Sequence, residues 1–389
     1  MLTERPAPLL QEIMLNSILS FGPDSAPLQL QNLNVLIGPN GSGKSNLIEA
    51  IGLLKSTTTD CRPVISRGGG VKEWIWKGRP SDHAAIEVVV SNSAGGNRIE
   101  HCFAFRNANQ LFRIILEQVR VGGDFSNPRY EFSEASGASF HRQLNPMIQM
   151  QSEIDPQLSI LAQRRDPTYF PEITRLAAAY DKIALYREWT FGRSAVCRQP
   201  QRADERSDRL AEDFSNLGMF LNRLRRDPRA KAAVLAGLRD LYEGLTDFDV
   251  IVEGGTVQVF FTEGEFAIPA TRLSDGTIRY LCLLAILCDP EPPPLICIEE
   301  PELGMHPDLI PKIADLLVDA STRTQLIVTT HSDILVDSLT ETPECIIVCE
   351  KVNGQTVMSR LNPDDLKVWL ENYTLGTLWI KGQLGGKRW

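Results

Sequence analysis

The segment GPNGSGKS at positions 38–45 constrains the fold of this chain more than any other feature. It fits the pattern G-x-x-x-x-G-K-[ST] and lies between the apolar run LNVLI, at 33–37, and an expected helix from Lys44 to about Leu54. A strand, a glycine-rich turn and a helix in this order form a phosphate-binding loop. We therefore predict an α/β fold in which this loop joins a buried strand to a helix.

Each part of the loop has an expected role. Backbone N–H groups of Asn40 through Lys44 can surround phosphate oxygens, and the helix N-terminus adds partial positive charge. Lys44 is expected to reach the β- and γ-phosphates of ATP, and Ser45 is expected to ligate Mg²⁺. The predicted nucleotide-binding residues of the loop are Gly38, Pro39, Asn40, Gly41, Ser42, Gly43, Lys44, Ser45 and Asn46.

Two carboxylates follow a second apolar strand, in LICIEEPE at 295–302. Ligands of open α/β sheets bind at the carboxyl edge of the strands, where these acids would lie. We expect Glu299 to contribute to the coordination shell of Mg²⁺ and Glu300 to act as the general base for an attacking water. The alternative interpretation is a pair of solvated acids after a strand.

A histidine follows a third apolar strand, in IVTTHSD at 327–333. His331 at this edge can hydrogen-bond a γ-phosphate and hold the attacking water in place. It is alternatively a surface histidine in a turn that caps a helix. Together with Lys44 and Glu300, it makes up the predicted set of catalytic residues.

The segment ATRLSDGTIRYLCLLAIL at 270–287 starts polar and continues apolar. Ser274, Asp275 and Gly276 stand at the start of a helix that is apolar from Tyr280 onwards. They serve either as a plain helix cap or as a site for an anion at the helix N-terminus. We include all three among the predicted nucleotide-binding residues.

The rest of the chain indicates three consecutive parts. The segment 86–132 alternates apolar and polar residues, which predicts an antiparallel meander with one solvent-exposed face. Apolar residues at three- and four-residue spacing predict helices over about 158–242, and TVQVFF and EFAIP predict a strand pair after them. The last hundred residues alternate strands with helices, which predicts a parallel sheet. The expected parts are 1–150 and 290–389, which form the ATP-binding lobe, and 151–289, a helical lobe with a short β-insert.

The four motifs occur in the order phosphate loop, Ser-Asp-Gly loop, acidic strand end and histidine strand end. This order resembles the ABC-type ATPase heads of the RecF/SMC class, where the motifs are Walker A, signature, Walker B and the switch histidine. The resemblance covers most of the chain as architecture and is specific over those four stretches. It implies the fold of an ABC-type P-loop NTPase head, with a mainly parallel central sheet, an antiparallel β-subdomain and a helical lobe.

The resemblance also implies that the chain pairs with itself in a nucleotide-sandwich dimer or a higher oligomer. In that family, the signature helix points at the γ-phosphate held by the Walker A loop of a second subunit. Ser274 and the Gly276 amide would make that contact. Asp275 stands where transporter-type signatures have glycine, so its charge must point away from the phosphate or take up a backbone amide. Glu299 stands where aspartate is usual, so a water-mediated metal contact is an alternative to direct ligation.

One further metal contact that the resemblance implies is the glutamine of the Q-loop. No tight motif marks it in this sequence. Gln163, just before the helical region, is the candidate, and Gln149 and Gln151 are the alternatives.

Within the class, the chain resembles the compact ATPases of the RecF and OLD type, which are AAA_21-like members of the AAA family. No heptad array interrupts the head, and IEEPELGMHP at 298–307 is typical of those proteins. They act in bacterial DNA repair and anti-phage defence. The resemblance implies an ATPase that controls a separately encoded effector, such as a TOPRIM-type nuclease or a toxin, or that acts on double-stranded DNA.

Three alternatives stay open. One is a RecF-like DNA-repair ATPase, and another is a scaffold that holds ATP without hydrolysing it. The third is the energising subunit of an ABC transporter. Lys44 and Ser274 are 230 residues apart, which disfavours the transporter, because transporter heads keep that interval much shorter.

Charge does not decide whether DNA is a partner. The net charge of −9 disfavours broad nonspecific binding to nucleic acid. The segment 187–231 nevertheless carries eleven Lys and Arg against seven Asp and Glu, and RLRRDPRAK at 223–231 is its densest part. The segment 187–231 either contacts nucleic acid or forms a solvated helix face on which basic and acidic residues pair.

The remaining features favour a cytoplasmic protein. None of the eight cysteines forms C-x-x-C, which indicates reduced core thiols and disfavours a zinc site or a zinc hook. No apolar stretch approaches the ~18 residues that a membrane span needs. The N-terminus lacks the pattern of a signal peptide. We therefore expect no membrane partner.

Overall fold

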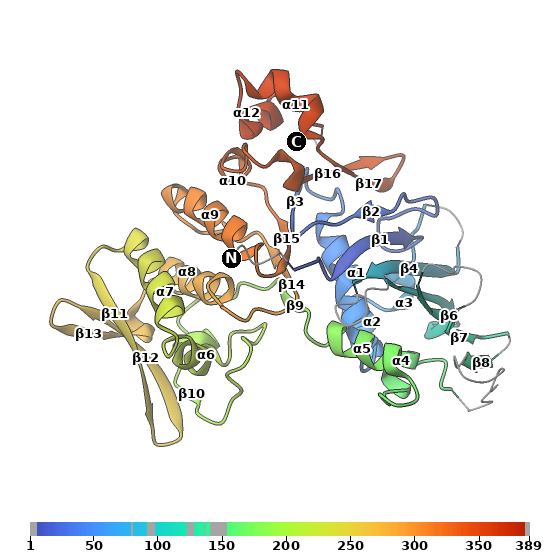
Figure 1. Cartoon of the computed structure of the whole chain (residues 1–389), viewed down its shortest axis with the longest axis horizontal. Coiled ribbons are helices and arrows are strands. Elements are labelled where there is room, and N and C mark those ends of the chain that lie inside the picture. Colours follow the sequence, from blue (N-terminus) through green and yellow to red (C-terminus); the bar gives the residue numbers. More distant parts are fainter. Residues whose placement is uncertain are drawn as a thin grey trace. The chain divides into compact units, whose positions relative to one another are not determined.

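The computed structural model describes residues 6–78, 81–91, 98–122, 128–135, 137–140 and 154–385. The chain forms two compact units, and each is built from segments that are distant in the sequence (Figure 1). The N-terminal unit comprises Ala7–Ile183, Glu344–Asn362 and Trp379–Trp389, and the C-terminal unit comprises Met1–Pro6, Ala184–Pro343 and Pro363–Leu378. The consecutive division predicted at 150 and 289 stays a prediction.

The N-terminal unit contains the meander expected over 86–132. Seven strands form one sheet in the order β2-β1-β4-β5-β6-β7-β8, and neighbouring strands run antiparallel. Buried and less buried residues alternate along β4, so one face of the sheet packs on the core. The strands are β1 (Leu10–Asn16), β2 (Leu28–Gln29), β4 (His83–Val90), β5 (Ile99–Ala108), β6 (Leu111–Val121), β7 (Tyr130–Ser133) and β8 (Gly137–Phe140).

The same unit holds the strand before the glycine-rich loop. All five residues of β3 (Leu33–Ile37) are buried, and β3 pairs in parallel with β16 (Ile346–Val352). An antiparallel strand that the sequence did not indicate, β17 (Gln355–Arg360), follows β16. The helices are α1 (Lys44–Ser56), α2 (Arg62–Arg67), α3 (Val71–Trp74), α4 (Ile160–Gln163) and α5 (Pro171–Tyr180), and η4 (Pro343–Cys345) precedes β16.

A fully buried polar network ties the meander to α4. The Glu117 carboxylate on β6 accepts hydrogen bonds from the Ser159 hydroxyl at 2.6 Å and the Ile160 backbone N–H at 2.8 Å. Its Oε1 also lies 3.1 Å from Nε2 of His101, whose Nδ1 lies 3.2 Å from the Tyr180 hydroxyl. Since buried polar groups are stable only when they are paired, this network specifies how α4 and α5 dock on the sheet.

We expect Glu117→Gln to destabilise the protein by about 2–4 kcal/mol, because an amide cannot accept from all the donors that meet at this carboxylate. The urea midpoint of unfolding measures the effect. Glu87→Gln, on β4 of the same sheet and only partly buried, is the matched control and should change the midpoint little. Equal small shifts in the two variants would contradict the structural role of Glu117.

The C-terminal unit contains three parallel strands in the order β15-β14-β9. The segments LICI and QLIVTT form β14 (Leu295–Glu299) and β15 (Gln325–Thr329), as predicted. A second, antiparallel sheet has the order β10-β12-β11, with β13 paired to β12. It is formed by β10 (Gln201–Arg202), β11 (Leu245–Glu253), β12 (Thr256–Glu263) and β13 (Phe266–Pro269).

The helices of this unit bury the segment that follows the Ser-Asp-Gly loop. Ten residues of α8 (Asp275–Leu287) are buried, and Gly237 of α7 (Pro228–Leu241) lets the two helices approach closely. A Cβ at Gly237 would lie 2.4 Å from Cδ2 of Leu284. The other elements are η1 (Val196–Arg198), α6 (Leu217–Leu224), η2 (Ala270–Arg272), η3 (Pro307–Leu309), α9 (Ile310–Ala320), α10 (Asp333–Asp337), α11 (Pro363–Leu370) and α12 (Leu375–Ile380).

The helical prediction over 158–242 is wrong in part. Helix α5 ends at Tyr180, and the next residues form the short strand β9 (Ala184–Tyr186) beside β14. Backbone pairing with β14 outweighs the helical spacing of the side chains, and it buries Tyr186. Strand β11 was also missed.

Candidate functional site

The predicted site residues belong to both units. The glycine-rich loop, Gly38–Asn46, and Gln163 lie in the N-terminal unit. The signature residues, the two acids after β14 and His331 lie in the C-terminal unit.

A positive φ and a close approach of neighbouring atoms together require glycine at two positions of the loop. Gly38 has φ 146°, and a Cβ there would lie 2.2 Å from the carbonyl oxygen of Cys349. Gly43 has φ 101°, and a Cβ there would lie 2.1 Å from Oγ1 of Thr356. Both conformations are strained for any residue with a side chain. The two glycines therefore let the loop pack closely against β16 and β17.

Lys44 begins α1 and folds back over the loop. Its Nζ donates to the carbonyl oxygens of Gly38 at 2.8 Å and Pro39 at 3.0 Å. Ser45 is exposed. The buried hydroxyl of Ser42 has no hydrogen-bond partner among the described residues. An ammonium, two hydroxyls and a helix N-terminus thus occur together in this segment, and these are the kinds of group that bind phosphate oxygens.

Two residues that the sequence analysis missed support this loop. The Asn46 side chain donates to the Ser20 hydroxyl at 2.7 Å. The hydroxyl of Thr356, on β17, lies 2.6 Å from the Ser20 hydroxyl and 2.8 Å from the carbonyl oxygen of Ser42. Thr356 follows the loop by more than 300 residues, so no local pattern could have indicated this contact.

Glu299, the predicted metal ligand, ends β14 and is engaged in an ion pair. Its Oε1 lies 2.9 Å from Nε of Arg187. The backbone carbonyl of Glu299 accepts a hydrogen bond from Nε1 of Trp189 at 2.6 Å. Arg187 and Trp189 follow β9, the strand that was expected to be helix, so the sequence analysis did not find them.

Glu300, the predicted base, has a backbone conformation that is rare for glutamate. Its φ is 46°, in the left-handed region, and its N–H donates to the Thr329 carbonyl at 3.0 Å. Oε1 of Glu300 lies 3.8 Å from Nε2 of His331, and the Glu300 side chain is 38% exposed. The structure thus brings the predicted base and the predicted switch histidine together at the ends of neighbouring strands.

Glu302 is a third acid near this pair that the sequence analysis did not assign. Its Oε1 accepts from the Thr330 hydroxyl at 2.6 Å and from the His331 N–H at 3.0 Å. Burial raises the pKa of Glu302, although these hydrogen bonds oppose the shift. Glu302 therefore fixes the backbone of His331 from the turn that follows β14.

Ser274 caps α8 in the way the plain interpretation predicts. Its hydroxyl accepts from the Thr277 N–H at 3.2 Å, and both Ser274 and Asp275 are exposed. Asp275 pairs with the buried guanidinium of Arg198, which also donates to the Leu273 carbonyl. The side chain of Asp275 is thus held by an arginine instead of a backbone amide.

The start of α8 lies beside the turn that follows β14. A Cβ at Gly276 would lie 3.7 Å from the carbonyl oxygen of Gly304, and one at Gly304 would lie 3.1 Å from Nη1 of Arg279. The Arg279 guanidinium lies 5.3 Å from the ring centre of Trp189. Burial lowers the pKa of Arg279. The signature helix and the acidic turn are therefore in direct contact within the C-terminal unit.

The side chain of Gln163 holds its own loop in this structure. Its Oε1 accepts from the Asp155 N–H at 3.0 Å, and its Nε2 donates to the carbonyls of Asp155 at 3.1 Å and Leu158 at 2.7 Å. A role as metal ligand would require these bonds to break, and it stays a prediction. Gln149 and Gln151 lie outside the described residues.

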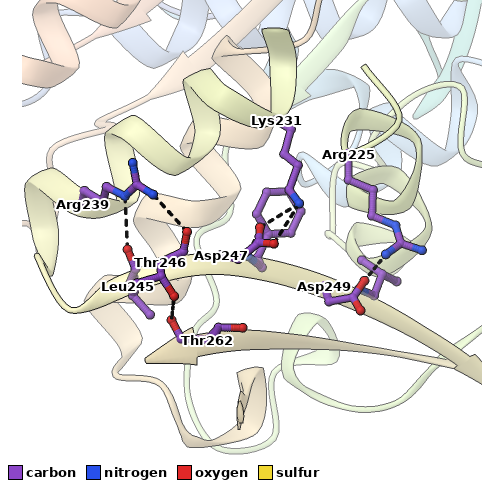
Figure 2. A network of polar contacts seen from close by, with 10 residues as sticks. Arg225, Lys231, Arg239, Leu245, Thr246, Asp247, Asp249 and Thr262 are labelled. Atoms are coloured by element: carbon purple, nitrogen blue, oxygen red, sulfur yellow. Dashed lines mark hydrogen bonds and ion pairs between the residues drawn. The ribbon is translucent and has the colours of Figure 1, made fainter. Parts of the chain in front are cut away.

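The basic segment 187–231 is largely neutralised by acids. At least seven of its eleven basic residues form ion pairs with Asp or Glu. Figure 2 shows two of these pairs, in which Arg225 and Lys231 contact Asp249 and Asp247 on β11. The pairing favours the interpretation as a face of mixed charge, because paired acids cancel much of the field that would attract DNA.

A family model described as "AAA domain, putative AbiEii toxin, Type IV TA system" matches residues 33–337, which is more than half of the chain. The chain belongs to this family. The match spans all four motifs, from the glycine-rich loop to His331. A search of curated proteins finds no match to this AAA-domain protein.

Solved structures of SMC heads share the fold of the AAA-domain protein. One is an Smc head bound to the C-winged helix domain of ScpA, with TM-score 0.59 and 15% identity over 92% of this chain and 99% of that chain. Another, from Pyrococcus furiosus and bound to the C-terminal domain of ScpA, has TM-score 0.57 and 15% identity over 94% and 99%. A third, from Pyrococcus yayanosii, has TM-score 0.53 and 12% identity over 94% and 99%.

These findings confirm the predicted fold class, the ABC-type P-loop ATPase head of the SMC/RecF class. They place the AAA-domain protein in the AAA/SMC-like ATPase class, and membership of this class implies nucleotide binding. All eight cysteines are free thiols, and seven are buried. In the described part of the chain, no helix is both long and apolar enough to span a membrane.

Proposed function

We propose that this protein is a molecular switch that binds and hydrolyses ATP, and that two copies close around two nucleotides. The observation that carries the proposal is the pair formed by Glu300 and His331, 3.8 Å apart at the ends of two neighbouring strands. A strained acid next to a histidine suits the activation and orientation of a water. The exposed Ser274 at the start of α8 supports a contact with a second copy.

In this mechanism each residue has one task. Glu300 accepts a proton from the attacking water, and His331 orients that water and the γ-phosphate. Lys44 exchanges its bonds to the Gly38 and Pro39 carbonyls for phosphate oxygens. Ser274 and the Gly276 amide of the second copy contact the same γ-phosphate.

The donors present fit Mg²⁺. Ser45 would provide a hydroxyl and Glu299 a carboxylate, and Mg²⁺ prefers oxygen ligands completed by phosphate and water. In the described ranges, no group of three or more His, Cys, Asp or Glu is placed to hold a metal ion. Phosphate and water would therefore have to supply the remaining ligands. When bound, Mg²⁺ would neutralise charge on the phosphates.

The partner that this ATPase controls is proposed to be a separately encoded effector, such as a nuclease or toxin. The proposed setting is anti-phage defence in the cytoplasm. The family description, with its toxin and Type IV TA system, supports this. SMC heads in complex with parts of ScpA show that heads of this fold can bind a partner protein. DNA is the less favoured partner, because the basic residues of the segment 187–231 are largely paired with acids.

We expect Lys44→Met to weaken ATP binding about 100-fold or more and to abolish hydrolysis, because a charged group that contacts phosphate is lost. Binding of a fluorescent ATP analogue and release of phosphate are the measurements. Lys55→Met, in the last turn of the same helix, is the matched control. Wild-type hydrolysis by Lys44→Met would contradict the proposed function.

The phosphate-release assay also tests which partner stimulates the ATPase. Wild-type protein is compared alone, with double-stranded DNA, and with the product of a neighbouring gene. Stimulation only by the second protein supports the effector. Stimulation by DNA would instead favour a role in repair or DNA sensing.

A further inference from the structure

Arg187 is placed by the fold next to the predicted metal ligand. It directly follows β9, which runs parallel to β14 with Tyr186 opposite Ile298. This register places Arg187, the first residue after β9, beside Glu299, the last residue of β14, at the carboxyl edge of the two strands. Their side chains form an ion pair at 2.9 Å and are 35% and 18% exposed.

The segment that carries Arg187 is anchored at this edge. Nε1 of Trp189 donates to the Glu299 carbonyl at 2.6 Å. The Trp189 ring stacks on Phe191 and Phe214, with ring centres 6.1 Å and 5.5 Å away. A part-buried ion pair on an anchored segment loses less side-chain entropy than a pair on a mobile surface. The contact with Glu299 is thus built into the fold around β9 and β14.

We propose that Arg187 is a latch on Glu299, and that the pair must open before Glu299 can hold Mg²⁺. This inference rests on the proposed function, since it concerns the metal that accompanies ATP. An arginine stays charged at any pH at which a protein is folded, so only an exchange of partners can free the carboxylate. A guanidinium and Mg²⁺ then compete for the same carboxylate, and Arg187 sets the Mg²⁺ concentration at which the nucleotide site is completed.

The experiment titrates Mg²⁺ against a fluorescent, nonhydrolysable ATP analogue bound to the full chain. In Arg187→Met, we expect the Mg²⁺ concentration for half-maximal enhancement of binding to fall about five- to tenfold. Arg187→Lys keeps a charge without the planar fork and should lie between Met and wild type. Arg193→Met, an exposed arginine of the same segment, is the matched control and should match wild type.

A second variant keeps the test sharp if Arg187→Met does not fold. Trp189→Phe keeps an aromatic ring beside Phe191 and Phe214 and removes the indole N–H that donates to the Glu299 backbone carbonyl. Because this loosens the anchor of the segment that carries Arg187, it should lower the required Mg²⁺ about twofold. An unchanged or higher Mg²⁺ requirement in these variants, with Mg²⁺-free binding intact, would overturn the latch alone. Failure of the wild-type protein to bind the analogue at any Mg²⁺ concentration would overturn the proposed function and the latch with it.

Discussion

Glu300→Gln is expected to lower the rate of ATP hydrolysis about 10²- to 10⁴-fold, the usual contribution of a general base. The amide keeps the shape of the side chain but cannot accept the proton of the attacking water. Binding of ATP should persist, because the glycine-rich loop and Lys44 lie in the other unit. Phosphate release at saturating ATP measures the rate, and analogue binding measures the affinity.

The control for this variant is Glu291→Gln, which changes an exposed acid in the loop before β14. It should hydrolyse ATP like the wild-type protein. Because Glu300 lies 3.8 Å from His331, we also expect little further loss when His331→Ala is added to Glu300→Gln. Wild-type turnover by Glu300→Gln would show that the base assignment is wrong.

Ser274→Arg is expected to abolish ATP-driven dimerisation while nucleotide binding stays intact. Ser274 is exposed at the start of α8, and an arginine there adds bulk at the place where the second copy's nucleotide is proposed to lie. Light scattering with Glu300→Gln as the background, so that ATP is not consumed, measures the dimer.

Loss of the helix cap must be separated from loss of the contact between copies. Ser274 accepts from the Thr277 N–H, and removal of such a cap costs about 1 kcal/mol. Ser274→Ala loses the same cap, so the two variants should share a small decrease in thermal stability. Ser338→Arg adds an equal charge at an exposed position after α10 and should still dimerise. Dimerisation of Ser274→Arg at wild-type ATP concentrations would refute the contact between copies.

Predictions from motifs were confirmed where the residues of one short segment determine its local structure. The loop at 38–45 follows a buried strand and opens a helix at Lys44, as its glycine spacing requires. The apolar strands before Glu299 and His331 also formed as predicted. Longer stretches without such a constraint were less predictable, as the short strand β9 shows. Its three residues take their conformation from pairing with β14, which lies more than 100 residues later in the chain.

The sequence by itself determined the class of fold and the set of candidate residues, because glycines, strand-end acids and a strand-end histidine at these positions suit phosphate chemistry with few alternatives. Only the tertiary structure decided what those residues contact. It paired Arg187 with Glu299 and Arg198 with Asp275 in ion pairs. It also placed the Glu302 carboxylate at the His331 backbone N–H, and the Thr356 hydroxyl at a carbonyl of the glycine-rich loop. Side chains meet through parallel strand pairing and through packing between distant segments, and neither leaves a local signal in the order of the residues.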